Sequence, residues 1–227
     1  MIDPATARFL SLVSHEFRTP LTVIQSSCDL LESYGDRWEN DRRISHYRRI
    51  QSAVVDMTAL LENTALLASF DAMGYRPTPE RLVPGPFLGG LLESARSMAP
   101  DRTIESSWEP ESMGFPVDQR LLQASVANLL SNALRFSGGP VEVGIAIRDS
   151  RLEVRVRDRG PGIAEEDRDR IWQPFERGAG TSGIPGVGLG LAIVARGTAL
   201  CGGSAALLPR DGGGIEAVLS LEQGVIE

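Results

Sequence analysis

The sequence predicts a long α-helical hairpin followed by an α+β sandwich of two layers. Up to about residue 70, apolar residues recur at spacings of three and four, which is the period of an amphipathic helix. After about residue 80, helical segments are mixed with segments in which apolar and polar residues alternate, as they do in β-strands. At 227 residues the chain is long enough for two modest domains. We expect a helical domain at residues 1–71, a linker at 72–80 and an α+β domain at 81–227.

The first predicted helix covers residues 5–34, and a turn at Gly35 and Asp36 separates it from a second helix at 38–69. The inward stripe of the first helix is expected to contain Leu10, Val13, Phe17, Leu21, Ile24, Cys28 and Leu31. That of the second is expected to contain Ile44, Tyr47, Gln51, Val54, Met57 and Leu61. Two amphipathic helices bury little surface on their own, so we expect two copies to form a dimeric four-helix bundle.

The second half of the chain mixes both patterns. Helices are expected at residues 87–98, 118–136 and 189–200, and strands at 141–147, 152–157, 204–208 and 215–221. A sheet layered on helices makes an α+β sandwich. Pro77 and Pro79 prevent a continuous helix between the halves, so we expect the second domain to swing relative to the first.

Composition excludes several functions. A net charge of −7 argues against nonspecific nucleic-acid binding, and all 23 basic residues are arginine, so no lysine-based phosphate loop is present. Cys28 and Cys201 lack metal-like spacing and are expected to be reduced thiols. No signal peptide and no run of about 20 apolar residues is evident. We expect a cytoplasmic fragment that lacks an upstream sensor or membrane segment, and inner-membrane anchoring of the full-length protein stays open.

His15 is one of only two histidines in the chain. At about 100° per residue it lies about 200° around the helix from Val13, so it is expected to face away from the apolar stripe. Thr19 lies one turn further along on the same face, about 40° away. Pro20 removes a backbone hydrogen bond and is expected to kink the helix locally. The second histidine, His46, is expected at an exposed or interface position without a catalytic role.

The second half carries residues suited to a magnesium nucleotide. Asn128 and Asn132 lie one helical turn apart, and their amide oxygens are ligands that Mg²⁺ accepts. Asp158 ends a predicted strand before a glycine-containing loop, which allows close backbone approach. Residues 178–190 contain six glycines and are expected to form a mobile lid that leads into a helix, where backbone amides suit phosphate oxygens.

Five blocks occur in a fixed order. They are Ser14-His15-Glu16-Phe17-Arg18-Thr19-Pro20, Asn128-Leu129-Leu130-Ser131-Asn132, Asp158-Arg159-Gly160-Pro161-Gly162, Trp172-Gln173-Pro174-Phe175-Glu176-Arg177 and Gly186-Val187-Gly188-Leu189-Gly190. In this order they resemble the H, N, G1, F and G2 boxes of sensor histidine kinases, over nearly the whole chain. The resemblance implies a Bergerat-type ATP-binding fold for the second domain and an ATP-dependent protein-histidine kinase.

By this resemblance, His15 accepts the phosphoryl group, Glu16 accepts the ring proton, and Thr19 orients water for dephosphorylation of a response regulator. Asn128 and Asn132 would hold Mg²⁺, and Asp158 would accept a hydrogen bond from adenine. The other expected nucleotide contacts are Arg135, Phe136, Gly160, Gly162, Phe175, Arg177, Gly186, Gly188, Leu189 and Gly190. Arg159 departs from the pattern, because the family usually has asparagine there.

The function implied is autophosphorylation of His15 followed by phosphoryl transfer to an aspartate of a response regulator, together with phosphatase activity towards that regulator. Three alternatives remain open: a phosphatase-dominant enzyme, a non-catalytic ATP-binding scaffold, and a conformational ATPase clamp. The clamp leaves the His15 block unexplained. The scaffold does not account for the presence of His15, Glu16 and both asparagines.

Overall fold

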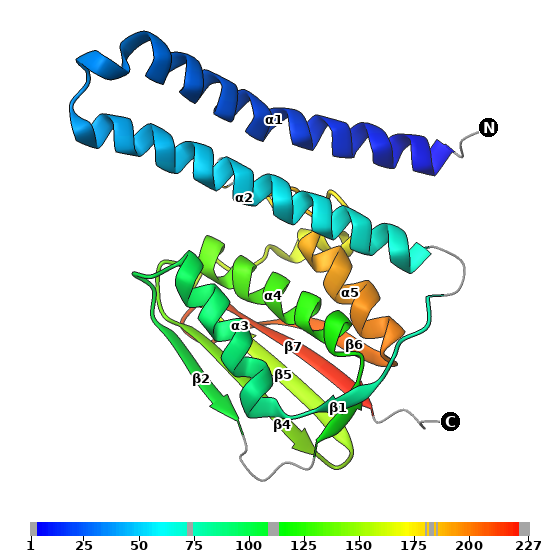
Figure 1. Cartoon of the computed structure of the whole chain (residues 1–227). Coiled ribbons are helices and arrows are strands. Elements are labelled where there is room, and N and C mark those ends of the chain that lie inside the picture. The colour runs from blue at the N-terminus through cyan, green and yellow to red at the C-terminus, as the bar shows by residue number, and fades with distance from the viewer. Residues whose placement is uncertain are drawn as a thin grey trace. The chain divides into compact units, whose positions relative to one another are not determined.

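The computed structural model describes residues 4–71, 75–108, 114–179, 181, 184 and 186–222, which form two compact units, Met1–Ala68 and Ser69–Glu227. The first unit is the expected hairpin. It consists of α1 (Pro4–Tyr34), a short 3-10 turn (Gly35–Arg37) and α2 (Asn40–Asp71), whose last turn belongs to the second unit (Figure 1). Of the expected linker, residues 72–74 lie outside the described residues.

Within the single chain, the inward stripe predicted for α2 is buried only in part, because Ile44 and Met57 are half-buried and Gln51 is exposed. The buried stripe repeats every seven residues and consists of His46, Ala53, Leu60 and Leu67. The residues one step further, Tyr47, Val54 and Leu61, are 51%, 49% and 60% exposed. A helix in a single hairpin covers only one stripe, and α2 has two neighbouring apolar stripes, so periodicity alone could not rank them. The second stripe is left for a partner helix of the kind that a four-helix bundle supplies.

For α1 the prediction was right in part. Val13 is buried, and Phe17, Ile24 and Leu31 are half-buried as expected. In contrast, Leu10 and Leu21 are about half exposed, and Cys28 is exposed.

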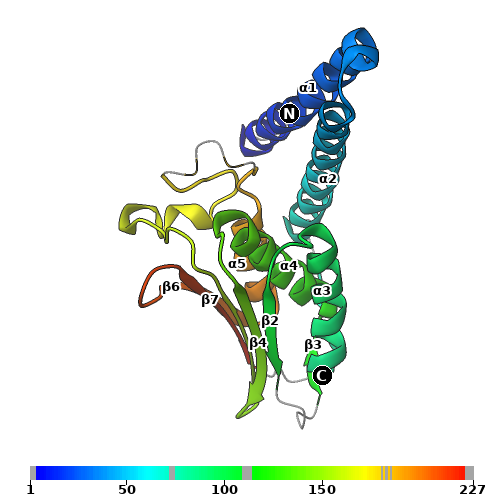
Figure 2. The ribbon, with the colours of Figure 1, turned by 90° about the vertical axis from the view of Figure 1, so that its left-hand side faces the viewer.

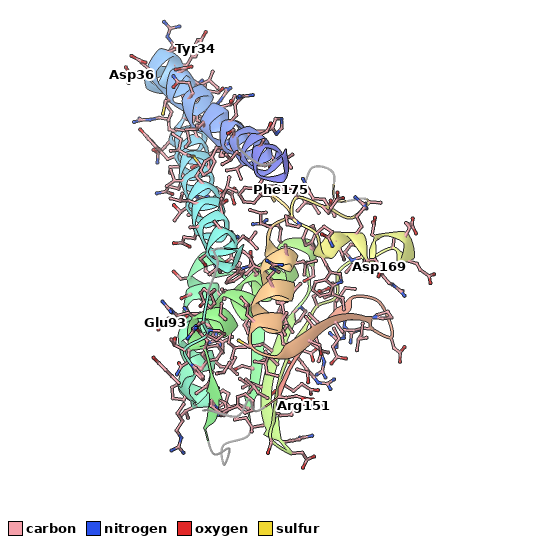
Figure 3. The ribbon with its side chains drawn as sticks, turned by 90° about the vertical axis from the view of Figure 1, so that its right-hand side faces the viewer. Tyr34, Asp36, Glu93, Arg151, Asp169 and Phe175 are labelled. Atoms are coloured by element: carbon pink, nitrogen blue, oxygen red, sulfur yellow. The ribbon has the colours of Figure 1, made fainter. Side chains whose placement is uncertain are left out.

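An aromatic cluster occupies the tip of the hairpin, where Figure 3 labels Tyr34 and Asp36. Trp38 stacks on Tyr34 and on His46, with ring centroids 6.2 and 4.9 Å apart, and the Arg42 guanidinium lies 4.2 Å from the Trp38 ring. His46 is therefore buried in the packing rather than exposed. No hydrogen-bond partner of its Nδ1 lies among the described residues.

The hydropathy of α2 is higher than expected from a sequence in which no long apolar run is evident. Among the described residues, the helical segment Asn40–Phe70 is long enough to cross a membrane and contains an 18-residue window with a mean hydropathy of 1.3. Length and composition alone are weak evidence for a span. Two neighbouring apolar stripes raise hydropathy in the same way, because both contribute apolar residues to one window.

The second unit is the expected sandwich. Its elements are β1 (Glu80–Leu82), α3 (Pro84–Met98), β2 (Ile104–Trp108), β3 (Phe115–Val117), α4 (Gln119–Phe136), β4 (Val141–Arg148), β5 (Arg151–Arg157), α5 (Gly190–Leu200), β6 (Gly203–Pro209) and β7 (Ile215–Glu222). The five-stranded sheet has the order β2-β4-β5-β7-β6, in which only β2 and β4 are parallel. Helices α3, α4 and α5 cover one face of it (Figure 2).

The predicted helices and strands are confirmed, and three strands were missed. β1 and β3 are three residues each and pair only with one another. β2 lies at the sheet edge and buries only Ile104, so its sequence does not alternate between apolar and polar residues. The core lies between the helices and the inner side of the sheet, where Val141, Val154 and Leu219 are almost fully buried.

Asp118 joins the end of the linker to the start of α4. Its Oδ1 accepts hydrogen bonds from the backbone amides of Arg120 and Leu121, which makes it the N-cap of α4. Its Oδ2 accepts from the Thr78 amide at 3.0 Å and the Tyr75 hydroxyl at 3.3 Å. From Tyr75 onwards, the segment predicted to be a linker is therefore fastened to the start of α4.

We expect Asp118→Ala to lower the free energy of unfolding of the second unit by about 3 kcal/mol, because a helix cap and charge-assisted bonds are lost together. Burial alone raises the pKa of Asp118, but the amides of Thr78, Leu121 and Arg120 outweigh it and hold the pKa below its usual value. The stabilisation is therefore complete above the unfolded pKa of about 3.9 and is lost as pH falls through the lower folded pKa.

Urea denaturation followed by Trp108 and Trp172 fluorescence in a Trp38→Phe background measures this effect at pH 7 and pH 3. The control is Glu93→Ala, which removes an exposed carboxylate from α3 (Figure 3). Equal stability of the two variants at pH 7 would contradict the role of Asp118.

Candidate functional site

The predicted acceptor lies on an exposed face of α1. The His15 side chain is 70% exposed, and its Nδ1 lies 3.2 Å from Oε1 of Glu16. In the neutral imidazole, a proton on Nδ1 is donated to this carboxylate, which leaves the lone pair on Nε2. With Nδ1 held in this way, Nε2 is the ring nitrogen whose lone pair is available.

Thr19 and Pro20 follow within one turn. Thr19 is exposed, in agreement with its predicted position on the His15 face. α1 continues through Pro20 as a single helix. Because proline has no amide hydrogen, the Glu16 carbonyl lacks its usual helical donor, so the backbone is weakened directly beside His15.

The two predicted amides lie on α4, near the start of α5. Asn128 and Asn132 are half-buried, and Nδ2 of Asn128 donates to the Ala124 carbonyl at 2.9 Å. A Cβ atom on Gly190 would lie 2.9 Å from Oδ1 of Asn128, so this oxygen meets the first residue of α5. Leu189 is the N-cap of α5 and is buried, which fixes the helix start in the core. The site thus joins an amide oxygen to a helix N-terminus.

Asp158 follows β5 directly, and its side chain closes the next loop. Its Oδ1 accepts a hydrogen bond from the Gly160 amide at 2.7 Å. Gly160 in turn packs on the main chain of Phe136, since a Cβ atom there would lie 2.8 Å from the Phe136 carbonyl oxygen. Burial raises the pKa of Asp158, which the amides of Gly160 and Ile215 and the charge of Arg210 counteract. Gly162 ends the loop with φ +83°.

The two ends of the predicted lid are joined by a backbone hydrogen bond between Phe175 and Gly188. The amide of Phe175, a residue with φ +64°, donates to the Gly188 carbonyl at 2.9 Å. Gly188 has φ +75°, and a Cβ atom there would lie 2.7 Å from the Glu176 carbonyl oxygen, so only glycine fits. Figure 3 labels Phe175 at this point. Of the lid, residues 180, 182, 183 and 185 lie outside the described residues.

Two predicted phosphate contacts differ in their surroundings. Arg135 lies beside the lid, because a Cβ atom on Gly186 would be 2.6 Å from its Nη1. Arg177 instead donates from Nη2 to the carbonyls of Thr181 and Ile184, at 2.6 and 2.7 Å. In this structure Arg177 therefore organises the lid itself, and contact with a phosphate would require it to release these carbonyls.

Asp167, which was not predicted from the sequence, anchors the start of the lid. Asp167 is buried and accepts hydrogen bonds from the Ala179 amide and from Arg170, which also pairs with Glu176. The Ala179 amide and the Arg170 guanidinium hold the pKa of Asp167 below its usual value. Its position in the charged run at residues 165–170 gave no signal, because such runs are usually solvated.

These residues fit a magnesium nucleotide. The Oδ1 atom of Asn128 is a hard oxygen ligand beside a helix N-terminus that favours anions. Gly160 and Gly188 lie so close to neighbouring backbone that a side chain would not fit at either position, so only main-chain atoms are present there. No group of three or more His, Cys, Asp or Glu side chains able to hold a metal occurs within the described part of the chain.

Comparison with known families matches both units. Residues 5–72 match the His Kinase A (phospho-acceptor) domain. Residues 117–224 match the family described as histidine kinase-, DNA gyrase B-, and HSP90-like ATPase.

Individual relatives agree with these matches. The chain is 32% identical over 194 residues to sensor protein kinase PmrB of Pseudomonas aeruginosa, a match that covers 85% of this chain and 40% of the relative. It spans less than half the length of the curated relatives that it matches.

Two solved structures are similar. The histidine kinase domain of the Escherichia coli osmosensor EnvZ is 32% identical with a TM-score of 0.52, and the match covers 69% of this chain and 95% of that one. Full-length ShkA in complex with AMPPNP is 25% identical with a TM-score of 0.63, over 96% of this chain and 46% of that one.

Proposed function

The chain belongs to the histidine kinase family, and on this basis we propose that it transfers the γ-phosphoryl group of ATP to His15 and then to an aspartate of a response regulator. The observation that carries the proposal is the exposed His15 ring, whose Nδ1 is held by Glu16. A scaffold would not need this pair, whereas a phosphoryl acceptor does.

The transfer step follows from the ring geometry. Nε2 of His15 attacks the γ-phosphorus, so that a P–N bond forms and the bond from the γ-phosphorus to the bridging oxygen breaks, with ADP as the leaving group. Glu16 accepts the Nδ1 proton as charge develops on the ring, which is general-base assistance. The product is a phosphohistidine.

The second unit would supply and orient the nucleotide. Asp158 accepts a hydrogen bond from the adenine amino group, and the N-terminus of α5 faces the phosphates. Asn128 and Asn132 would hold Mg²⁺, which neutralises charge on the phosphate oxygens when bound. The AMPPNP complex of ShkA supports a nucleotide at this fold. Positioning supplies most of the rate enhancement in such transfers.

Three further features belong to the proposal. Dimerisation is supported by the exposed apolar stripe containing Tyr47, Val54 and Leu61. Phosphatase activity towards the regulator is supported by Thr19, an exposed hydroxyl one turn from His15. A cytoplasmic location follows from the use of cellular ATP.

Incubation of the chain with Mg²⁺ and γ-labelled ATP tests the proposal. We expect acid-labile, alkali-stable label on the protein, because a P–N bond has this stability. Addition of a cognate response regulator should then move the label to acid-stable, alkali-labile acyl phosphate. A folded dimer that binds ATP but acquires no label would overturn kinase activity and favour the scaffold.

A further inference from the structure

Arg159, which replaces the usual asparagine, reaches the turn between β6 and β7. Its Nη1 donates to the carbonyls of Asp211 and Gly213, at 2.8 and 3.2 Å. This turn is closed by its own backbone, because the Arg210 amide donates to the Gly214 carbonyl and the Gly213 amide donates to the Arg210 carbonyl. The Arg159 side chain therefore binds a turn whose conformation is already fixed by its own backbone hydrogen bonds.

A second arginine, Arg210, belongs to the turn itself, and its side chain reaches back to Asp158 and to β4. The Arg210 side chain is only 14% exposed. Its Nη1 donates to the Asp158 carbonyl at 3.1 Å, and its Nη2 donates to Oε1 of Glu142 on β4 at 2.8 Å. The hydrogen bond from Arg210 outweighs burial and lowers the pKa of Glu142, so this pair stays ionised. Arg210 thus connects the turn to β4 and to Asp158, the residue proposed to bind adenine.

The backbone contacts leave Asp158 little freedom. Its amide donates to the Ile215 carbonyl at 3.0 Å. Gly214 has φ +101°, and a Cβ atom there would lie 2.1 Å from the Asp158 carbonyl oxygen, so the turn presses directly on this residue. Both backbone groups of Asp158 are bonded to the β6–β7 segment, which fixes the position of its main chain, and the Gly160 amide holds its carboxylate.

We propose that Arg159 and Arg210 are positioning residues for base recognition: they clamp the β6–β7 turn onto Asp158 and aim its carboxylate at the adenine amino group. The inference rests on the proposed nucleotide site. Neither arginine touches the base, and both act through Asp158. Burial raises the pKa of Asp158, and the charge of Arg210 is one of the contributions that oppose this rise.

The test compares ATP with inosine triphosphate, in which a carbonyl oxygen replaces the 6-amino group. Equilibrium Kd values are measured for both nucleotides with wild type, Arg159→Ala, Arg210→Ala and Arg210→Lys. We expect each alanine variant to bind ATP about tenfold more weakly and to lose most of its preference for ATP over inosine triphosphate, since misaimed polar groups lose much of their selectivity. Arg210→Lys should recover part of the preference for ATP, because lysine keeps the positive charge but cannot donate to Asp158 and Glu142 from two separate nitrogens.

Arg151→Ala is the matched control. Arg151 is also an arginine of this sheet, pairs with Glu222 at 2.7 Å, and lies at the end of the sheet remote from Phe175 (Figure 3). It should retain both affinities. Binding stoichiometry and circular dichroism report the folded fraction, and the exposed Arg159 can be removed without opening the core.

The possible outcomes are distinct. A wild-type preference for ATP that both alanine variants retain overturns the inference while leaving the proposed function intact. Equal loss of both affinities, with the preference unchanged, also overturns it, because a general structural role would act in that way. Failure of folded wild type to bind ATP removes the proposed function itself, and the inference with it.

Discussion

Replacing His15 with glutamine is expected to reduce incorporation of γ-phosphoryl label by at least about 10³-fold, since the attacking nitrogen is lost and an amide is not a nucleophile. The side chain is 70% exposed, so its replacement should leave the hairpin folded. Affinity for ATP should remain within about twofold, because the exposed substitution removes no residue of the nucleotide site. The measurement is the rate of label incorporation, alongside the Kd for ATP.

His46→Gln is the matched control for this variant, because it replaces the only other histidine of the chain. His46 is buried against Trp38, so its replacement should lower stability but leave the acceptor in place. Labelling per folded molecule should therefore persist in His46→Gln. Acid-labile label at the wild-type level in His15→Gln would show that another residue is the acceptor.

Replacing Asp158 with asparagine is expected to weaken ATP binding by about 100-fold and to reverse the preference of the site for the base. If the amide oxygen accepts the Gly160 hydrogen bond, as Oδ1 now does at 2.7 Å, the amide NH₂ is left as the neighbouring polar group. Two NH₂ groups facing each other cannot hydrogen-bond, whereas the 6-oxygen of inosine triphosphate can accept. Autophosphorylation with ATP should fall in parallel.

Kd values for ATP and inosine triphosphate measure this reversal. The control is Asp169→Asn, an exposed aspartate that Figure 3 labels away from the sheet, and it should bind both nucleotides like wild type. Loss of ATP affinity without any gain in the relative affinity for inosine triphosphate would exclude a direct hydrogen bond from Asp158 to the base.

The predicted helices of the second unit illustrate what could be read in advance. α4 carries a regular apolar stripe and begins at an aspartate suited to capping its first amides, so its limits were visible locally. Strands β4 and β5 alternate strictly and were equally clear. β2 was missed because an edge strand with one buried residue derives its structure from pairing with β4, not from its own pattern.

The hairpin shows the opposite case. Both apolar stripes of α2 have helical spacing, and the structure alone separated His46 and Leu60, which are buried, from Tyr47 and Leu61, which are exposed. The choice depends on the neighbouring helix, and the spacing of residues within one helix contains no information about it. The same holds for Arg159, whose departure from the family pattern was visible but whose contacts with Asp211 and Gly213 were not.

By itself, the sequence determined the two-part architecture, and it predicted the acceptor His15, the order of the five blocks and a glycine-rich lid. These features depend on residue type, local periodicity and spacing along the chain, which a sequence records directly. Only the tertiary structure decided which nitrogen of His15 is held by Glu16, that Asp118 fastens the linker, and that two arginines clamp the turn on Asp158. Each of these is a side-chain bond selected by three-dimensional proximity, in most cases between segments far apart in the chain.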